Sequence, residues 1–491
     1  MDNFRSKSMD GEWWLPDAPQ HRYRATLKID DRHHGELVFR GTEEHLSSLP
    51  HAWQRQTFYG VLDNGYDYEV SLFNVGMKKG PSSTFPKQPG RETTAEFFTN
   101  NILVGGHISD EDQPFLHGAL VLLTGLDEWC DKSGFSGSVK RDPSEDIATE
   151  TVEIAFKASS TPHYDVGDGR LIRFLSEYRG PLMFDYRQSF ELRQRNSVNL
   201  TFAKAISVKD LLAEISIWQS FVTLGLRNAS YIEEVTVLVH THGENFTRFG
   251  LIVPGRNPDA SRKRRGAREH FFNYSKLGDD AGHLLKAWRT GQEKIEIAVL
   301  LFTSNAYQDA GYIHIHLLSY LQALEILHRE TLKSDRFQTA DSRRQTISAL
   351  RAAIPSDLGD ELRKEIYGQL AFVGSLTLLD RLKHLLSLYP KSLRPLFARG
   401  DMDMMLLKNV RNFLTHYSGQ KALTKDFLWS RDIAVLKEKA RLFVETCLLG
   451  AIGMSDDQIH SLMDQFEAYR DWRMETSMEF INAMLKEESS D

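Results

Sequence analysis

The first quarter of the chain alternates apolar and polar residues with a period of two. From Trp13 to about Trp129, short segments of this kind are separated by turns that contain Gly, Asp and Asn. This period, with many β-branched and aromatic residues, is typical of antiparallel β-strands. We predict strands in the segments RYRATLKID, GELVFRG, TFYGVLDNG, YEVSLFNV, FFTNNILVGGHI and GALVLLTGL. The region is expected to form a β-sandwich or a strongly curved antiparallel sheet.

The next part of the chain mixes strand-like segments with one helix. Strand patterns return after a polar stretch at 140–146, in TVEIAFKAS, PLMFDYRQSFELRQ, VNLTFAKAI, EEVTVLVH and EKIEIAVLLFTS. Between them, Ser207 precedes a segment with apolar residues at helical spacing as far as Leu226. Serine is a preferred N-cap residue, so the helix is predicted to begin directly after it. This middle segment is therefore α+β.

From about Asn305 onward the hydrophobic period changes to 3.6 and stays there. Seven segments read as amphipathic helices, among them IHIHLLSYLQALEILHRE, SLTLLDRLKHLLSLY and MDMMLLKNVRNFLTHYSG. We therefore predict an α+β multidomain protein with a β-rich N-terminal region and an all-α C-terminal bundle. The expected domains are a β domain at 1–138, an α+β segment at 139–304 that continues the N-terminal region, and the bundle at 305–491.

Composition adds a constraint on partners. The chain has 491 residues, 41% hydrophobic and 26% charged, as in an ordinary globular protein of more than one domain. Its net charge of −7 argues at first against a nucleic-acid partner. However, Asp456–Asp491 holds 10 acidic and 3 basic residues, which accounts for the whole excess. Between 381 and 421 there are 8 basic and 2 acidic residues, so that region is compatible with RNA.

Several classes of protein lose support from missing signals. No apolar run approaches the ~20 residues that span a bilayer, and the N-terminal segment lacks the apolar core of a secretory signal. We therefore expect a cytoplasmic protein without a membrane partner. Cys130 and Cys447 are too far apart in sequence for a CxxC zinc site and are expected to be ordinary buried thiols. GxxxxGKS/T, GxGxxG and GxSxG motifs are missing, and no cofactor is expected.

Two histidine pairs and one basic segment remain as candidate binding groups. His240/His242 and His314/His316 have no obvious third ligand nearby, so we expect no metal site. The segment PGRNPDASRKRRGAREH could contact phosphate, because clustered cations release counterions from a nucleic-acid backbone. A solvated loop is an equally good interpretation. The candidate phosphate contacts in this segment are Arg262, Lys263, Arg264 and Arg265.

An Arg and a His separated by four residues stand out in the bundle. The sequence RNFLTH contains Arg411 and His416, and of the three such spacings in the chain only this one lies in a predicted bundle helix. The other two are Arg40/His45 and Arg265/His270. At 100° per residue, Arg411 and His416 are about 140° apart and flank Asn412 and Thr415 on a polar arc. The apolar stripe consists of Leu406, Leu407, Val410, Phe413 and Leu414.

This polar arc carries the groups that metal-free RNA cleavage requires. Attack by the RNA's own 2′-OH needs a base, an acid for the departing 5′-oxygen and a cation for the phosphorane. His416 can transfer protons near neutral pH, and Arg411 offers a fixed fork for phosphate oxygens. One chain supplies one His, so a two-fold dimer would complete the site. The plain alternative is a surface Arg with a helix-ending His.

Beyond its spacing, the motif resembles the HEPN superfamily, whose all-α domains carry Rx4–6H, commonly with a polar residue after the Arg. Asn412 occupies that position here. More specifically, the chain resembles the ApeA-like family of anti-phage HEPN proteins. The N-terminal matches are GEWWLPD, GELVFRG, FYGVL, Gly106-His107, and Leu126 followed three residues later by Trp129; LQALEILHRE fits the first helix of the bundle.

The resemblance implies a bacterial, metal-independent ribonuclease that acts in abortive infection and cleaves host RNA, with tRNA as the expected substrate. Arg411 and His416 would be catalytic and Asn412 would support them, while Glu325 could orient one of them or be a solvated charge. Further candidate phosphate contacts are Lys408, Arg381 and Lys383. Expected partners are RNA, a second copy of the chain, and a phage-encoded or nucleic-acid trigger. Two alternatives stay open: a non-catalytic dimerising or RNA-binding protein, and the toxin of a toxin–antitoxin pair.

Overall fold

A computed structural model divides the chain into two compact units, 1–289 and 290–491. Each unit is described by itself. The structure describes residues 7–42, 46, 49, 56–63, 68–79, 92–142, 149–180, 192–240, 246–255, 269–308, 312–332, 339–355, 357–370, 372–416 and 430–474.

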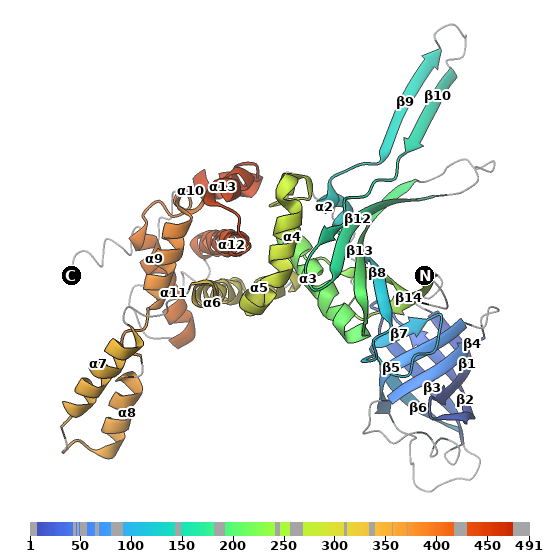
Figure 1. The fold of residues 1–491 in the computed structure, drawn as a ribbon, viewed down its shortest axis with the longest axis horizontal. Helices are drawn as coiled ribbons and strands as arrows, with labels where there is room; N and C mark the ends of the chain where they lie inside the picture. The colour runs from blue at the N-terminus through green and yellow to red at the C-terminus, as the bar shows by residue number, and fades with distance from the viewer. Residues whose placement is uncertain are drawn as a thin grey trace. The chain divides into compact units, whose positions relative to one another are not determined.

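The first unit begins with a closed antiparallel barrel (Figure 1). Around the ring, the strands pair in the order β1–β2–β3–β6–β5–β4 and back to β1. They are β1 (Lys7–Leu15), β2 (Ala18–Ile29), β3 (Gly35–Thr42), β4 (Gln56–Leu62), β5 (Tyr68–Lys79) and β6 (Glu92–Thr99). The prediction of a strongly curved sheet is thus confirmed, and closure into a barrel takes the place of a sandwich.

Trp13 fills the barrel interior, where it is fully buried. Its indole N–H donates to the Ala25 carbonyl over 3.2 Å, which satisfies the one polar group of a buried ring. Gly60 lies directly opposite Trp13 in the β1–β4 register, and a Cβ there would come within 2.4 Å of the indole. The glycine therefore makes room for the large side chain.

The neighbouring residue Trp14 points the other way, as alternation along a strand requires. Its ring contacts His107 edge to face at a centroid distance of 5.2 Å, and His107 stacks on Tyr59 at 4.6 Å. The Arg22 guanidinium lies 4.2 Å from the centroid of the Trp14 ring. The GEWWLPD and Gly106-His107 segments, 92 positions apart between Trp14 and Gly106 in sequence, thus meet in one aromatic cluster on the outer side of the barrel.

The sheet continues beyond the barrel through seven more strands in the order β7–β15–β14–β8–β13–β12–β11. They are β7 (Asn101–Val104), β8 (Leu116–Leu123), β11 (Tyr164–Asp165), β12 (Arg170–Arg179), β13 (Arg193–Ile206), β14 (Ile232–His240) and β15 (Phe246–Ile252). A separate hairpin is formed by β9 (Phe135–Asp142) and β10 (Thr149–Phe156). Because β8 pairs with β13 and β14, the predicted 1–138 and 139–304 segments share one sheet.

Helix α3 (Val208–Leu226) begins and ends as the sequence predicts. Ser207 and Asp210 form a reciprocal capping box at its start. The other helices of the unit are α2 (Leu126–Cys130), the 3₁₀ helix η4 (Ser275–Asp280) and α4 (Ala281–Thr290). Trp129 of α2 is fully buried and packs against Phe221 of α3. The Leu126–Trp129 phrase therefore helps to form the core that holds α3 on the unit.

The described residues of the second unit form helices joined by turns and loops, as predicted (Figure 1). Its helices are α5 (Gln292–Tyr307), α6 (Ile313–Thr331), α7 (Ala340–Ala352), α8 (Asp360–Leu370), α9 (Leu378–Leu388), α10 (Pro390–Leu393), α11 (Asp401–His416), α12 (Arg431–Ala451), α13 (Asp456–Asp464) and α14 (Glu467–Met474). Helix α6 packs against α5, α9, α11 and α12, and α9 packs against α11. These contacts bring α6, α9 and α11 together around the candidate site.

The prediction of a strand at EKIEIAVLLFTS is wrong, because these residues belong to helix α5. The buried residues Ile295, Ala298, Val299 and Phe302 follow helical spacing, whereas Ile297 and Leu300 on the other side are exposed. A continuous apolar run hides the period by which a helix and a strand are told apart. The division between the units consequently lies at 289/290, ahead of the predicted 304/305.

No helix within the described ranges is both long and apolar enough to cross a membrane. The thiols of Cys130 and Cys447 are both free and buried, and burial raises the pKa of each above its ordinary value. Of the predicted strand PLMFDYRQSFELRQ, residues 181–191 lie outside the described residues.

Candidate functional site

Helix α11 carries the Rx4H motif, and its backbone is helical from Asp401 through His416. The predicted apolar stripe faces the interior: Leu406, Leu407, Val410 and Phe413 are buried, and Leu414 is half-buried. On the predicted polar arc, Arg411 and Asn412 are half-buried and Thr415 is exposed. The His416 side chain lies outside the described residues. The described part of the motif is thus available at the surface of the bundle.

Glu325 of α6 lies beside Arg411 of α11. The distance from Arg411 Nη2 to Glu325 Oε2 is 3.9 Å, and the two side chains are 27% and 20% exposed. The Arg411 guanidinium also donates from Nη1 to the Asn412 side-chain oxygen over 3.4 Å. Because the guanidinium is held from two sides, fewer of its orientations remain accessible. The orienting role of Glu325 stays a prediction, and the structure places its carboxylate beside the Arg411 guanidinium.

The Glu325 carboxylate has a second partner on its own helix. Arg329 donates from Nη2 to Glu325 Oε1 over 2.7 Å, so the two carboxylate oxygens face different arginines. Arg329 is half exposed, and a solvated pair of this kind contributes little to stability. Its effect at the site is geometric, because it keeps the Glu325 side chain from turning away from Arg411.

A buried chain of hydrogen bonds lies one turn along α6 from Glu325. Arg381 Nη1 is 3.1 Å from His328 Nδ1, and His328 Nε2 is 3.2 Å from His384 Nδ1. A guanidinium only donates, so His328 Nδ1 accepts and, in the neutral ring, Nε2 carries the proton and donates to His384. His384 then keeps its own proton on Nε2. His328 and Arg381 are buried, whereas His384 is exposed.

This chain corrects the prediction that Arg381 contacts RNA phosphate. Its side chain is 2% exposed and is directed to His328 inside the bundle, so it does not reach the surface. The sequence pattern misled because an Arg on an amphipathic helix is ordinarily solvated. Sequence analysis also missed His328 and His384. The available signal was the i, i+3 spacing of Glu325 and His328 on α6 and of Arg381 and His384 on α9, which puts each pair on one helix face.

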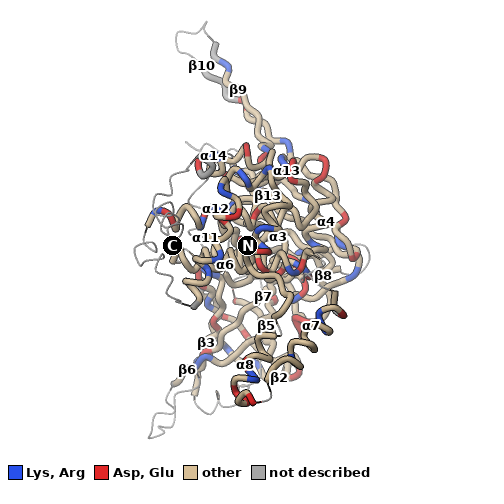
Figure 2. The backbone as a smooth tube through the Cα atoms, turned by 90° about the vertical axis from the view of Figure 1, so that its left-hand side faces the viewer, with Lys and Arg blue, Asp and Glu red and all other residues tan. Residues whose placement is uncertain are grey.

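Of the other predicted phosphate contacts, Lys408 lies three residues before Arg411 on the same helix, whereas Lys383 does not lie at the motif. Lys383 of α9 pairs with Asp401 over 2.7 Å at the opposite end of α11 from the motif, and Lys408 is half-buried on α11 itself. The basic segment that contains Arg262, Lys263, Arg264 and Arg265 lies outside the described residues. Figure 2 shows that Lys and Arg are interspersed with Asp and Glu along the chain.

The histidine pairs do not gather further metal ligands in the described ranges. His314 and His316 lie in the first turn of α6, and His240 ends β14, while His242 is outside the described residues. Over those same ranges, no three His, Cys, Asp or Glu side chains form a group that could hold a metal ion.

Both parts of the chain match models of known protein families. A family model described as ApeA N-terminal domain 1 matches residues 8–288, more than half of the chain, and one described as Apea-like HEPN matches residues 318–458. Neither a curated protein nor a solved structure gives a match. The HEPN match covers α9, α11 and the part of α6 from residue 318 onward, and therefore includes every described residue of the candidate site. The chain belongs to the ApeA family, with an ApeA N-terminal domain followed by an ApeA-like HEPN domain.

Proposed function

We propose that the protein is a metal-independent RNA endonuclease of anti-phage defence, and that its site is centred on Arg411 and His416. Membership of the ApeA family supports a HEPN nuclease acting against phage. One observation carries the proposal furthest. The half-exposed Arg411 guanidinium lies in the HEPN region and is held by Glu325 of α6 and by Asn412 beside it. A fixed, accessible guanidinium is suited to a phosphate diester.

The proposed reaction needs two proton transfers and one cation. His416 takes the proton from a ribose 2′-OH while that oxygen attacks the adjacent phosphorus. The bond from phosphorus to the 5′-oxygen breaks, and the leaving oxygen receives a proton from a second imidazole that is in its protonated, imidazolium form. Arg411 binds the non-bridging oxygens and stabilises the charge that develops on them. The products are a 2′,3′-cyclic phosphate and a 5′-hydroxyl. The 2′-OH is the nucleophile, so the step consumes no water molecule.

The second imidazole is proposed to come from a second copy of the chain. A two-fold dimer would place two copies of the motif at one groove, with the partner subunit's His416 as the acid. The RNA substrate is proposed to be tRNA, and cleavage of host RNA would halt growth before phage mature. The ApeA N-terminal domain would regulate the nuclease in response to an infection signal.

The test compares the wild type with His416→Ala and Arg411→Ala. Each protein is first shown to be folded and its mass is measured by sedimentation, then it is incubated with total tRNA in EDTA, with and without lysate from phage-infected cells. We expect cleavage by the wild type and a loss of at least ~10²-fold in either variant. Lys364→Ala, an exposed basic residue of α8, is the control.

Product ends and mass test the remaining parts of the proposal. A 5′-hydroxyl and a cyclic phosphate support attack by the 2′-OH, whereas a 5′-phosphate contradicts it. If the active protein is a monomer, the proposal that two subunits form the site together is wrong. If the folded wild type binds tRNA but leaves it intact in both conditions, the non-catalytic HEPN alternative replaces the nuclease.

A further inference from the structure

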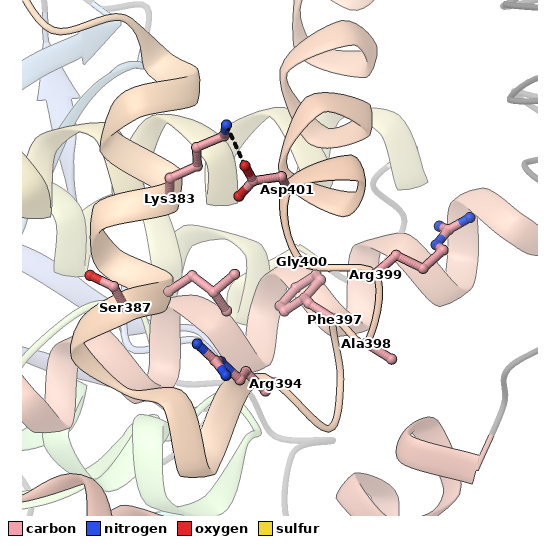
Figure 3. Close-up of a pocket in the computed structure, with 9 residues that line it drawn as sticks. Lys383, Ser387, Arg394, Phe397, Ala398, Arg399, Gly400 and Asp401 are labelled. Atoms are coloured by element: carbon pink, nitrogen blue, oxygen red, sulfur yellow. Dashed lines mark hydrogen bonds and ion pairs between the residues drawn. The ribbon is translucent and has the colours of Figure 1, made fainter. Parts of the chain in front are cut away.

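An open pocket of about 380 Å³ lies in the helical unit where α9, α10 and the start of α11 meet. It is separate from Arg411, Asn412 and Glu325, none of which lines it. Figure 3 shows Lys383 and Asp401 on one side of the pocket and Arg394 on the other. The lining residues are Lys383, Leu386, Ser387, Arg394, Phe397, Ala398, Arg399, Gly400 and Asp401.

Basic side chains predominate over acidic ones in this lining. Lys383, Arg394 and Arg399 are cationic and Asp401 is the one acid among the nine. Arg399 is directed to Asp403 over 2.6 Å and is already engaged. Arg394 is exposed, and its guanidinium makes no hydrogen bond or ion pair within the part of the chain that the structure describes. It points toward the pocket in Figure 3.

Lys383 is held only loosely by its partner. The Lys383–Asp401 pair has a separation of 2.7 Å, but the two side chains are 36% and 73% exposed. A pair so open to solvent is screened and costs little to rearrange. A phosphate group between Lys383 and Arg394 could therefore compete with Asp401 for the ammonium, because its negative charge is of the same sign. A planar guanidinium and a point-charge ammonium around one space are a combination suited to phosphate oxygens.

The pocket and the candidate active site lie on one rigid helix. Gly400 lines the pocket directly before α11, and Arg411 is eleven positions further along. At about 1.5 Å per residue this is a separation of about 16 Å along the helix axis. A stacked nucleic-acid strand advances about 3.4 Å per nucleotide, so about five nucleotides span it. A strand of about five nucleotides is therefore long enough to extend from one place to the other.

We propose that the pocket formed by Lys383 and Arg394 binds a phosphate group, and that this phosphate belongs to the RNA strand held at Arg411. The proposal rests on the proposed function for the identity of the strand. The phosphate chemistry itself does not depend on it, because a free nucleotide presents the same group. The experiment therefore measures binding without cleavage and compares the two sources.

The probe is a fluorescent 2′-O-methyl RNA oligonucleotide, which has no free 2′-OH and cannot be cut by the proposed reaction. Binding to the full chain is measured over a range of salt concentrations for the wild type, Arg394→Gln, Arg394→Lys and Arg344→Gln. The last variant removes the same charge from an exposed position on α7. AMP is used in parallel, both as a direct ligand and as a competitor.

We expect Arg394→Gln to weaken oligonucleotide binding by about three- to tenfold and to reduce the slope of log K against log salt by about 0.7. Arg394→Lys should bind more tightly than Arg394→Gln, and Arg344→Gln should match the wild type. Binding of AMP alone that depends on Arg394 would support the phosphate site but overturn its assignment to RNA. If Arg394→Gln binds both probes as the wild type does, the proposal is wrong.

The two proposals fail in different ways. If the protein binds the oligonucleotide through Arg394 but leaves tRNA intact, the phosphate site is supported and the nuclease proposal is wrong. If the protein cuts tRNA but its binding of the oligonucleotide does not change in Arg394→Gln, the nuclease proposal is supported and the phosphate site is wrong.

Discussion

Arg411 and Glu325 lie 3.9 Å apart across the contact between α11 and α6, although 86 positions separate them in sequence. Both side chains are partly exposed, so the pair adds little to folding stability. What it does is restrict the guanidinium of the Rx4H motif. We therefore propose that Glu325 is a positioning residue, and we expect its loss to lower catalysis before it lowers stability.

Glu325→Gln is expected to lower kcat by about tenfold with little change in KM, because Arg411 stays present but is less well oriented. Glu325→Asp should recover part of the loss. Glu330→Gln, an exposed carboxylate on the same helix, is the control and should behave as the wild type. Steady-state kinetics on tRNA measure these values. A KM effect with unchanged kcat would contradict the positioning role.

Arg411→Lys separates charge from geometry. Lysine keeps the positive charge but has no planar fork and cannot hold two phosphate oxygens in fixed directions. We expect it to retain RNA binding within a few-fold and to lose about 10²-fold in the rate of cleavage. Binding is measured with uncleavable RNA and cleavage with tRNA. Full activity of this variant would show that charge alone suffices at the site.

The Arg381–His328–His384 chain is expected to stabilise the packing of α6 on α9. His328→Ala leaves the buried Arg381 guanidinium without this acceptor and should cost about 2 kcal/mol. His384→Ala leaves that hydrogen bond intact and should cost about 1 kcal/mol or less. Hydrogen exchange of α6 and α9 peptides, together with denaturant unfolding, measures both. A loss in His384→Ala as large as that in His328→Ala would contradict the larger contribution that we assign to the buried bond.

His316 should make stability depend on pH. Burial lowers the pKa of its imidazole, and the nearby Lys437 and Arg441 lower it further, while Glu438 acts in the opposite direction. The unfolded chain therefore takes up a proton at a higher pH than the folded chain does. Its contribution to stability is present above a pH of about 6.5 and declines as the pH falls below that value. His316→Asn should flatten this part of the curve of stability against pH.

Gly60→Ala is expected to destabilise the barrel by about 1–3 kcal/mol, because the new Cβ would overlap the buried Trp13 ring. Trp13→Phe has its own cost but makes space at that position. The double variant should lose less free energy of unfolding than the two single variants lose together. A double-mutant cycle measures this difference. Simple additivity would show that the glycine has a different role.

Local patterns in the sequence were enough for the elements whose period is unambiguous. The capping residue Ser207 predicted the start of α3, and the polar and apolar faces of α11 were predicted residue by residue. The EKIEIAVLLFTS segment failed because its apolar run carries no clear period. Barrel closure was also beyond a local pattern, since it depends on β6 pairing with both β3 and β5.

The sequence by itself determined the division into a β-rich and a helical part, and the motif at Arg411 and His416, because these follow from spacing within one segment. Only the tertiary structure decided which distant residues meet. It brings Glu325 to Arg411, buries Arg381 against His328, and leaves Arg394 exposed in the pocket that Lys383 also lines. Helix spacing says which residues share a face, but whether that face meets solvent or a neighbouring helix is set by how the helices pack.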